Sequence, residues 1–207
     1  MNEALLGAWE YLKDGGPVMW PLVMVSLLLW SLILRKGLWL LTAAREWINI
    51  SQASEWLRRG EVVSQKGGLC SGALGWFLAR RSGVLQADLR MWRAAARRQA
   101  GMIPRHLPAI MVLAAAAPLL GLLGTVTGMI ETFTVIREYG TGNAQALAAG
   151  ISEALITTQT GLLVAIPGFF AGYVLRRQAG TIQRKFTSFQ KEVEGWLKSE
   201  EAAGCPA

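Results

Sequence analysis

Residues of the kind that carry catalysis or bind metals are scarce in this chain of 207 residues. It has one histidine, His106, and two cysteines, Cys70 and Cys205, and no metal-ligand spacing surrounds either cysteine. The sequence has no nucleophile elbow, Walker loop, paired-cysteine or His-Glu-x-x-His motif. We therefore expect no enzymatic activity, no cofactor and no metal site, and we interpret His106 as a residue at the mouth of a membrane span.

Charged residues are also few, at 17%, whereas 52% of the residues are hydrophobic. The hydrophobic residues are concentrated in three blocks, each near the roughly 20 residues that a helix needs to cross a bilayer. These blocks are residues 17–34, 107–130 and 154–175. The composition thus predicts an all-α integral membrane protein with three transmembrane helices.

The first block could instead be a secretory signal peptide. Such a peptide would have basic residues ahead of the apolar core and a small-residue cleavage site after it. Here Glu3, Glu10, Lys13 and Asp14 precede the block, and Arg35-Lys36 follow it without such a site. We therefore predict that the block is a membrane anchor.

The basic residues are unevenly distributed. Of 21 Lys and Arg residues, 13 lie between Arg35 and Arg105 and six lie between Arg176 and Lys198. Positive charge beside membrane spans marks the cytoplasmic side, which predicts a periplasmic N-terminus and a cytoplasmic C-terminus. On that side the basic residues would attract anionic lipids, and we expect no disulfide between the two cysteines. Nucleic-acid binding is the weaker alternative and would require salt-sensitive retention of DNA.

These features divide the chain into seven segments. In order, they are a periplasmic interfacial helix (1–14), the first span (15–36), a cytoplasmic helical region (37–105), the second span (106–133), a short periplasmic loop (134–146), the third span (147–176) and a cytoplasmic C-terminal helix and tail (177–207). We expect the second and third spans to extend into long cytoplasmic helices.

Two patterns support the cytoplasmic assignments. In the region 37–105 we expect helices, the clearest over 86–99, separated by glycine-rich breaks, and a free-standing domain is not expected. The glycines concerned are Gly60, Gly67, Gly68, Gly72 and Gly75. The third span is expected to continue as an amphipathic helix whose apolar residues are Ile182, Phe186, Phe189, Val193 and Trp196.

Small and polar side chains recur at intervals of three and four residues in the second and third spans, so each set occupies one helix face. The second span carries Ala114, Ala117, Pro118, Gly121, Thr125, Gly128 and Thr132, and the third carries Gly150, Ala154, Thr158, Gly161, Ala165, Gly168 and Gly172. Such a face permits close helix packing, within one subunit or between subunits, for which Gly121, Gly128, Gly161, Ala165 and Gly168 are the candidates.

The alternative is that these faces, from several copies, line a central cavity. Thr125 and Thr158 would then supply the polar side chains of the cavity wall, although either hydroxyl could equally bond to a carbonyl oxygen of its own helix. Acidic residues near a membrane indicate a functional site more specifically than threonines do, because an ionisable group there is costly. Glu131 and Glu153 lie at the outer ends of the two spans. With Thr132 and Thr157 they form a possible rim, but a single acid there could also merely cap or solubilise a helix end.

Two longer runs resemble a known family. APLLGLLGTVTGMIETF (117–133) and GISEALITTQTGLLVAIP (150–167) are similar to the second-span and third-span signatures of the MotA/TolQ/ExbB proton-channel family, and the ExbB-like branch matches the three-span plan. The resemblance implies a stator subunit in the inner membrane of a Gram-negative bacterium. It implies a pentamer around an ExbD-like single-span partner that supplies the membrane aspartate, and it implies a TonB-like protein that is energised by proton flow.

In that family, Thr125 and Thr158 match pore-lining threonines and Glu153 matches a glutamate of the outer rim. The chain itself has no acid in the middle of any apolar block, so a partner must supply the carboxyl group for proton transfer. A TolQ-like role in envelope maintenance, or a passive scaffold for partner helices, remains an alternative.

Overall fold

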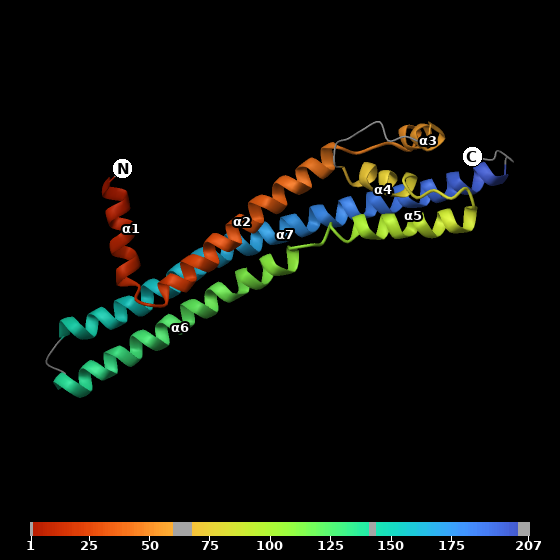
Figure 1. The fold of residues 1–207 in the computed structure, drawn as a ribbon. Helices are drawn as coiled ribbons and strands as arrows, with labels where there is room; N and C mark the ends of the chain where they lie inside the picture. Colours follow the sequence, from red (N-terminus) through yellow and green to blue (C-terminus); the bar gives the residue numbers. More distant parts are fainter. Residues whose placement is uncertain (1, 60–67, 141–143, 203–207) are drawn as a thin grey trace. The chain divides into compact units, whose positions relative to one another are not determined.

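The computed structural model describes residues 2–59, 68–140 and 144–202, and within these ranges the regular structure is entirely α-helical. Figure 1 shows the helices in chain order. They are α1 (Asn2–Asp14), α2 (Met19–Arg45), α3 (Ile50–Arg59), α4 (Leu69–Leu78), α5 (Leu85–Ala100), α6 (Leu107–Tyr139) and α7 (Ala144–Ala202). The all-α prediction is confirmed.

Three of these helices, α2, α6 and α7, are long and apolar enough to cross a membrane. They contain 27, 33 and 59 residues, and a residue rises about 1.5 Å along a helix axis, so each exceeds the roughly 30 Å of a bilayer core. Their apolar segments coincide with the three blocks predicted from the sequence. The chain is therefore a multi-pass membrane protein.

The chain forms two compact units. We call the first, Met1–Leu34 with His106–Tyr173, the membrane unit, and the second, Arg35–Arg105 with Val174–Ala207, the basic unit. The basic unit holds 19 of the 21 Lys and Arg residues. Helices α2 and α7 each contribute to both units, so the ends of the apolar blocks coincide with a change of unit.

The basic unit is built around aromatic side chains from α4, α5 and the C-terminal half of α7. The Trp92 ring lies edge-on to Phe77 and to Phe189, with ring centroids 5.8 and 6.2 Å apart. The indole nitrogen of Trp92 also donates a hydrogen bond of 3.1 Å to the carbonyl oxygen of Gln190. The cytoplasmic region predicted over 37–105 therefore folds together with residues 174–202 and not by itself.

The predicted amphipathic continuation of the third span is present, since α7 runs without a break to Ala202. Ile182, Phe186, Phe189 and Val193 are buried as expected, but Leu197, rather than Trp196, is buried at the next turn. The helix expected over 86–99 is also present as α5.

Two expected breaks are wrong. Gly72 and Gly75 lie inside α4 and do not interrupt it. A Cβ added to Gly72 would lie 2.8 Å from the side-chain nitrogen of Gln99 on α5, so this glycine permits close packing of two helices. Gly60 and Gly67, like Cys205, lie outside the described residues.

The second span differs from its prediction at both ends. Helix α6 begins at Leu107 and has no cytoplasmic extension, because Pro104 and Pro108 lack the amide hydrogens that a continuous helix would need there. At the other end, α6 continues to Tyr139 and α7 starts at Ala144, so most of the expected loop 134–146 is helical. Helix α6 ends at Tyr139, and the φ of 71° at the following Gly140 suits glycine.

A buried carboxylate organises the connection between α4 and α5 in the basic unit. The Asp88 carboxylate accepts hydrogen bonds of 2.8 Å from both the backbone nitrogen and the hydroxyl of Ser82, and one of 3.2 Å from the backbone nitrogen of Gly83. The guanidinium group of Arg81, the residue before Ser82, donates to the carbonyl oxygen of Leu57 and to the carboxylate of Glu200. Because a buried carboxylate needs such partners, this cluster holds the turn in one conformation.

Candidate functional site

The small-residue faces of α6 and α7 lie against each other within one subunit. A Cβ added to Gly121 would lie 3.1 Å from both the carbonyl oxygen of Thr157 and the Cα of Thr158. One added to Gly128 would lie 2.7 Å from the carbonyl oxygen of Gly150. A Cβ at either glycine would crowd the facing backbone, so the absence of side chains is what lets the two helices come together.

The contact between α6 and α7 continues toward the ends of the spans that lead into the basic unit. A Cβ added to Gly168 would lie 3.2 Å from the Cβ of Ala114 and 2.7 Å from a methyl carbon of Leu29 on α2. Ala165, one turn away, is buried. Four of the five residues assigned to helix packing, Gly121, Gly128, Gly161 and Gly168, therefore lie where helices of this subunit meet, and the fifth, Ala165, is buried.

Within this subunit, Gly121, Gly128 and Gly161 are covered by the neighbouring helix, as the packing interpretation of the small-residue faces expects. The physical reason is that a groove without side chains is filled most closely by the matching groove of the adjacent helix.

The two threonines lie at the edge of this contact. The Thr158 hydroxyl donates to the carbonyl oxygens of Gly121, at 3.2 Å, and Ala154, at 3.1 Å, and so joins α7 to α6. The Thr125 hydroxyl donates to its own helix, at the carbonyl oxygen of Leu122, over 2.7 Å. Both side chains are half-buried, so each keeps an accessible part.

Thr157 is different because it is fully buried. Its hydroxyl donates to the carbonyl oxygen of Ala154 over 3.0 Å, and its side chain fills the space beside Gly124. Thr132 likewise donates to its own helix, at Gly128, over 2.9 Å. Within this subunit, Thr157 therefore contributes to packing.

The outer ends of α6 and α7 form an open cavity of about 550 Å³. It is lined by Lys13, Asp14, Glu131, Thr132, Val135, Ala149, Gly150, Ser152 and Glu153. The structure thus brings together both acids predicted for the outer rim and adds two charged residues from the end of α1. Glu131 is exposed, whereas Glu153 is half-buried.

The turn between α1 and α2 covers part of Glu153. Oxygen Oε1 of Glu153 is buried and has no hydrogen-bond partner among the described residues. A Cβ added to Gly16 would collide with this carboxyl group, and Gly16 has a φ of +63°, which disfavours any other residue. The Tyr11 hydroxyl also lies 2.9 Å from that of Thr160 on α7, which further ties α1 to the third span.

This turn belongs to the site although its sequence does not predict it. Gly15-Gly16-Pro17 reads only as a helix break, and nothing in its pattern indicates that it packs against a residue nearly 140 positions later. The remaining candidate, His106, is half-buried at the start of α6 with a φ of 71°. No cluster of metal-binding side chains occurs in the part of the chain that the structure describes.

Three apolar helices, two of them joined through small-residue faces with acids at one end, define an all-helical multi-pass membrane protein. The sequence model of the MotA/TolQ/ExbB proton channel family matches residues 81–188, which include α6, most of α7 and part of the basic unit. The chain belongs to this family.

Similarity to individual proteins agrees with this family assignment. The chain is 34% identical over 169 residues to an ExbB-like biopolymer transport protein of Synechocystis, an alignment that covers 76% of this chain and 65% of the relative. It is 32% identical over 127 residues to the biopolymer transport protein ExbB of Xanthomonas campestris, covering 61% and 49%. It is 29% identical over 109 residues to the Tol-Pal system protein TolQ of Haemophilus influenzae, covering 53% and 48%. The alignments thus span between about half and two thirds of these relatives' lengths.

Proposed function

We propose that this chain is the stator subunit of a proton-driven motor of the ExbB type, which uses the proton motive force to energise TonB-dependent transport across the outer membrane. The observation that carries the proposal is the distribution of acids. No Asp or Glu occurs between Asp14 and Glu46, between Asp88 and Glu131, or between Glu153 and Glu192. The spans of this subunit hence offer no carboxyl group at mid-membrane, so a second chain must carry the proton there.

The paired helices α6 and α7 suit a proton pathway that uses a carboxyl group of a second chain. Glu131 and Glu153 lie at the cavity on the outer end, and Thr158 follows Glu153 by five residues, about 7.5 Å along the helix axis. Thr125 and Thr158 are half-buried, and a threonine hydroxyl can donate to and accept from a carboxyl group or water. We infer that these edges, not the buried glycines, face the partner helix.

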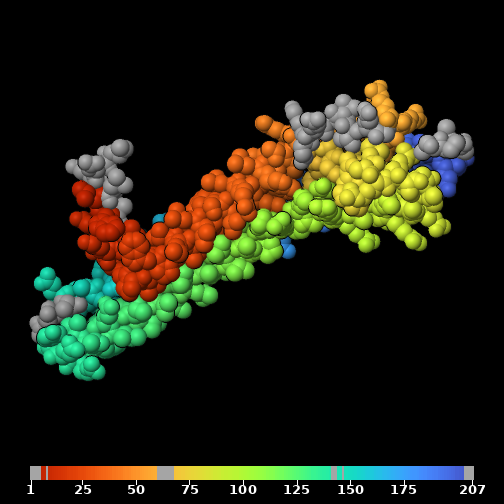
Figure 2. All heavy atoms as spheres, in the orientation of Figure 1, coloured from red at the N-terminus to blue at the C-terminus, as the bar shows by residue number. Residues whose placement is uncertain are grey.

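The assembly follows from this role. We propose a homo-oligomer, a pentamer by the family resemblance, that surrounds an ExbD-like single-span helix bearing an aspartate and passes its motion to a TonB-like protein. Figure 2 shows one side of the spans. Helix α6 exposes large apolar residues that suit lipid or neighbouring subunits. These are Leu119, Leu122, Leu123, Val126, Met129, Ile130 and Phe133.

The proposed orientation is the one that the charges favour. The outer cavity lies on the periplasmic side of a Gram-negative inner membrane, and the basic unit lies in the cytoplasm. A membrane potential then supplies roughly 2.3 kcal/mol per charge per 100 mV to a proton that crosses. This is sufficient to bias a step that depends on protonation of the partner's aspartate.

A role like that of TolQ is the second candidate, and a specific observation favours it. Besides the Haemophilus relative, the chain is 28% identical over 114 residues to the TolQ protein of Pseudomonas aeruginosa. The two roles differ in the energised partner. Restored uptake of a TonB-dependent substrate in a strain that lacks its own ExbB would support the first role, and restored detergent resistance in a strain that lacks TolQ would support the second.

The central test measures proton flux through the chain reconstituted in liposomes with its single-span partner. Thr158→Val and Thr125→Val are expected to abolish flux, because each removes a hydroxyl from the edge of the α6–α7 pair. Thr158→Ser keeps the hydroxyl and is expected to retain flux. Thr127→Val is the matched control: its hydroxyl, like that of Thr125, bonds to its own helix, at Leu123 and Gly124, but Thr127 is not assigned to the proposed pathway.

Normal flux in both Thr158→Val and Thr125→Val would refute the proposed pathway. Absence of flux in the wild-type complex, with partner helices still bound, would instead support the passive scaffold. Size-exclusion chromatography of each variant separates these outcomes from a failure to assemble.

A further inference from the structure

An open cavity of about 380 Å³ lies in the basic unit, where the chain passes from α2 into α3. It is lined by Glu46, Trp47, Ile48, Gln52, Glu55, Trp56 and Ser71. We propose that this cavity binds the ammonium group of an organic amine, with the carboxylate of Glu46 and the indole rings of Trp47 and Trp56 as its partners. The site does not depend on the proposed proton pathway, because none of its residues belongs to the membrane unit.

Helix α3 supplies one wall of the cavity. Ala53 and Leu57 are completely buried and fix this helix against the rest of the unit. Gln52, Glu55 and Trp56 are three and four residues apart, so they share a neighbouring face of the helix. Trp56 is half-buried, whereas Gln52 and Glu55 are exposed. The helix therefore contributes an indole ring with two polar side chains beside it.

The segment after α2 supplies another wall. A Cβ added to Gly68 would lie 3.2 Å from the Cβ of Glu46, so Glu46 packs beside the first turn of α4. The Trp47 ring lies edge-on to Phe189, with 6.3 Å between the ring centroids. Glu46 and Trp47 are both half-buried. The fold thus holds both residues in place before any ligand binds.

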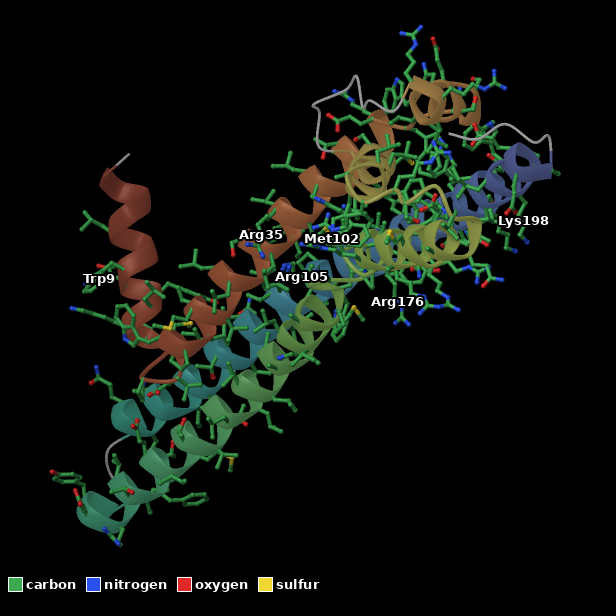
Figure 3. The ribbon with its side chains drawn as sticks, turned by 45° about the vertical axis from the view of Figure 1, so that its right-hand side comes forward. Trp9, Arg35, Met102, Arg105, Arg176 and Lys198 are labelled. Carbon is green, nitrogen blue, oxygen red and sulfur yellow. The ribbon has the colours of Figure 1, made fainter. Side chains whose placement is uncertain are left out.

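Glu46 is an exception among the acids of the basic unit. The unit has 19 Lys and Arg residues against eight Asp and Glu residues, and basic side chains, with their nitrogen atoms in blue, crowd around α4 and α5 (Figure 3). The other described acids of the unit that are shielded from solvent each pair with an arginine, namely Asp88 and Glu200 with Arg81 and Glu194 with Arg93. Glu46 has no ion pair within residues 2–59, 68–140 and 144–202. Because a shielded charge is costly unless it is paired, the Glu46 carboxylate suits a cation from outside the chain.

The two indole rings of the cavity lack a cation as well. Elsewhere in the basic unit, the rings of Trp39 and Trp76 each face a basic side chain of the same chain, at 4.0 and 4.5 Å from the ring centroid. Among the described side chains, no cation takes such a position over Trp47 or Trp56. The face of an indole ring attracts cations. These two rings, beside an unpaired carboxylate, can therefore accept a cation from a ligand.

The lining favours an organic ammonium group over other ligands. A metal ion needs several ligating side chains, and the described residues form no cluster that could hold one. The charge of Glu46 would repel an anion, and a neutral ligand would leave that charge unpaired. An ammonium group can donate hydrogen bonds to a carboxylate and lie against an indole ring at the same time. Since Glu55 already pairs with Arg59, we expect the cavity to take one positive charge.

The test uses the full chain in detergent micelles and measures binding of n-propylammonium by saturation-transfer NMR, with 1-propanol as the neutral analogue. The wild type is expected to bind the cation and not the alcohol. Glu46→Gln is expected to weaken binding of the cation about tenfold, because it removes a charged hydrogen-bond acceptor. Glu192→Gln is the matched control and should bind like the wild type, since Glu192 is an exposed acid elsewhere in the same unit.

Two further substitutions test the walls of the cavity. Trp56→Leu is expected to weaken binding about two- to fivefold through the loss of an aromatic face, whereas Trp56→Phe should retain most of it. Gln52→Lys places a competing ammonium group at an exposed position of the cavity wall and should abolish binding. Ser51→Lys is its control, because Ser51 is exposed but does not line the cavity. This last pair decides the matter if Glu46→Gln does not fold.

Equal weakening by Glu46→Gln and Glu192→Gln would overturn the proposal, since it would indicate attraction by net charge alone. Equal binding of 1-propanol and n-propylammonium by the wild type would also overturn it. Native mass spectrometry identifies the source of the ammonium group. Phosphatidylethanolamine that stays on the wild type but leaves Glu46→Gln would identify a lipid headgroup, and binding of n-propylammonium without retained lipid would identify a soluble amine. Absence of both kinds of binding would refute the site.

Discussion

Gly161 on α7 and Ala117 on α6 approach each other so closely that a Cβ on the glycine would lie 2.7 Å from the alanine carbonyl oxygen. Gly161→Ala is therefore expected to push the two helices apart and to destabilise the chain by about 1–3 kcal/mol, the usual cost of overpacking. Thermal unfolding in detergent measures this effect.

Gly180→Ala on the same helix is the control for that substitution. A Cβ at Gly180 meets nothing within 4 Å, so alanine there is expected to stabilise the helix by about 0.5–1 kcal/mol through its better helix propensity. An equal response of the two variants would contradict the close contact at Gly161.

Gly16→Ala is expected to disturb the turn that covers Glu153. The positive φ of Gly16 costs a non-glycine residue about 1–2 kcal/mol, and the new methyl group would collide with the Glu153 carboxyl group. Gly83→Ala has a similar positive φ of +77° but meets no atom within 4 Å, so it shows the backbone strain alone. Unfolding of both variants separates the strain from the collision.

A double-mutant cycle tests that collision directly. Glu153→Ala in the Gly16→Ala background is expected to recover part of the lost stability, because it removes the group that the new methyl would strike. Strictly additive effects of the two substitutions on stability would show that the turn does not pack against Glu153.

Glu194 is expected to make stability depend on pH at the acid end. Burial alone would raise the pKa of Glu194, but hydrogen bonds from Arg93 and Gln190 bring this pKa below its ordinary value. A carboxyl group with a lowered folded-state pKa stabilises the fold above its unfolded pKa of about 4.3. That contribution is lost as the pH falls through the folded-state pKa.

Glu194→Gln should therefore lower the melting temperature at pH 7 and have little effect near pH 3. Because the Arg93 side chain is 47% exposed, the loss at pH 7 is expected to be small. Glu192→Gln on an exposed part of α7 serves as the control. A difference between Glu194→Gln and wild type that grows toward low pH would contradict the ion pair.

The Cys70 thiol is expected to resist alkylation while the chain is folded. Burial raises the pKa of this thiol to about 12, although a backbone hydrogen bond at Ile48 lowers it slightly. The reactive thiolate is accordingly almost absent at pH 8. Iodoacetamide labelling of a Cys205→Ser variant, read by mass spectrometry, should modify Cys70 only after unfolding, and rapid labelling of the native chain would contradict its burial.

Much of the architecture follows from local pattern. The apolar blocks predicted α2, α6 and α7, and the spacing of Ile182, Phe186, Phe189 and Val193 predicted the buried face of α7, because a helix places such residues on one side whatever it packs against. The ends of α6 were harder to place. Residues 134–139 are polar enough for a loop, yet nothing among them breaks a helix before Gly140.

The amino-acid sequence by itself determined the membrane spans, the charge asymmetry, the absence of a mid-span acid and, through its two signature runs, the family. Only the tertiary structure decided that the small-residue faces of α6 and α7 cover each other, which leaves Thr125 and Thr158 at the edge. It also decided that Gly16 packs against the carboxyl group of Glu153 and that the ammonium group of Lys36 donates a hydrogen bond to the carbonyl oxygen of Met102. The physical reason is that periodicity specifies which side of a helix is small, apolar or charged, whereas the partner of that side depends on contacts between residues far apart in the chain.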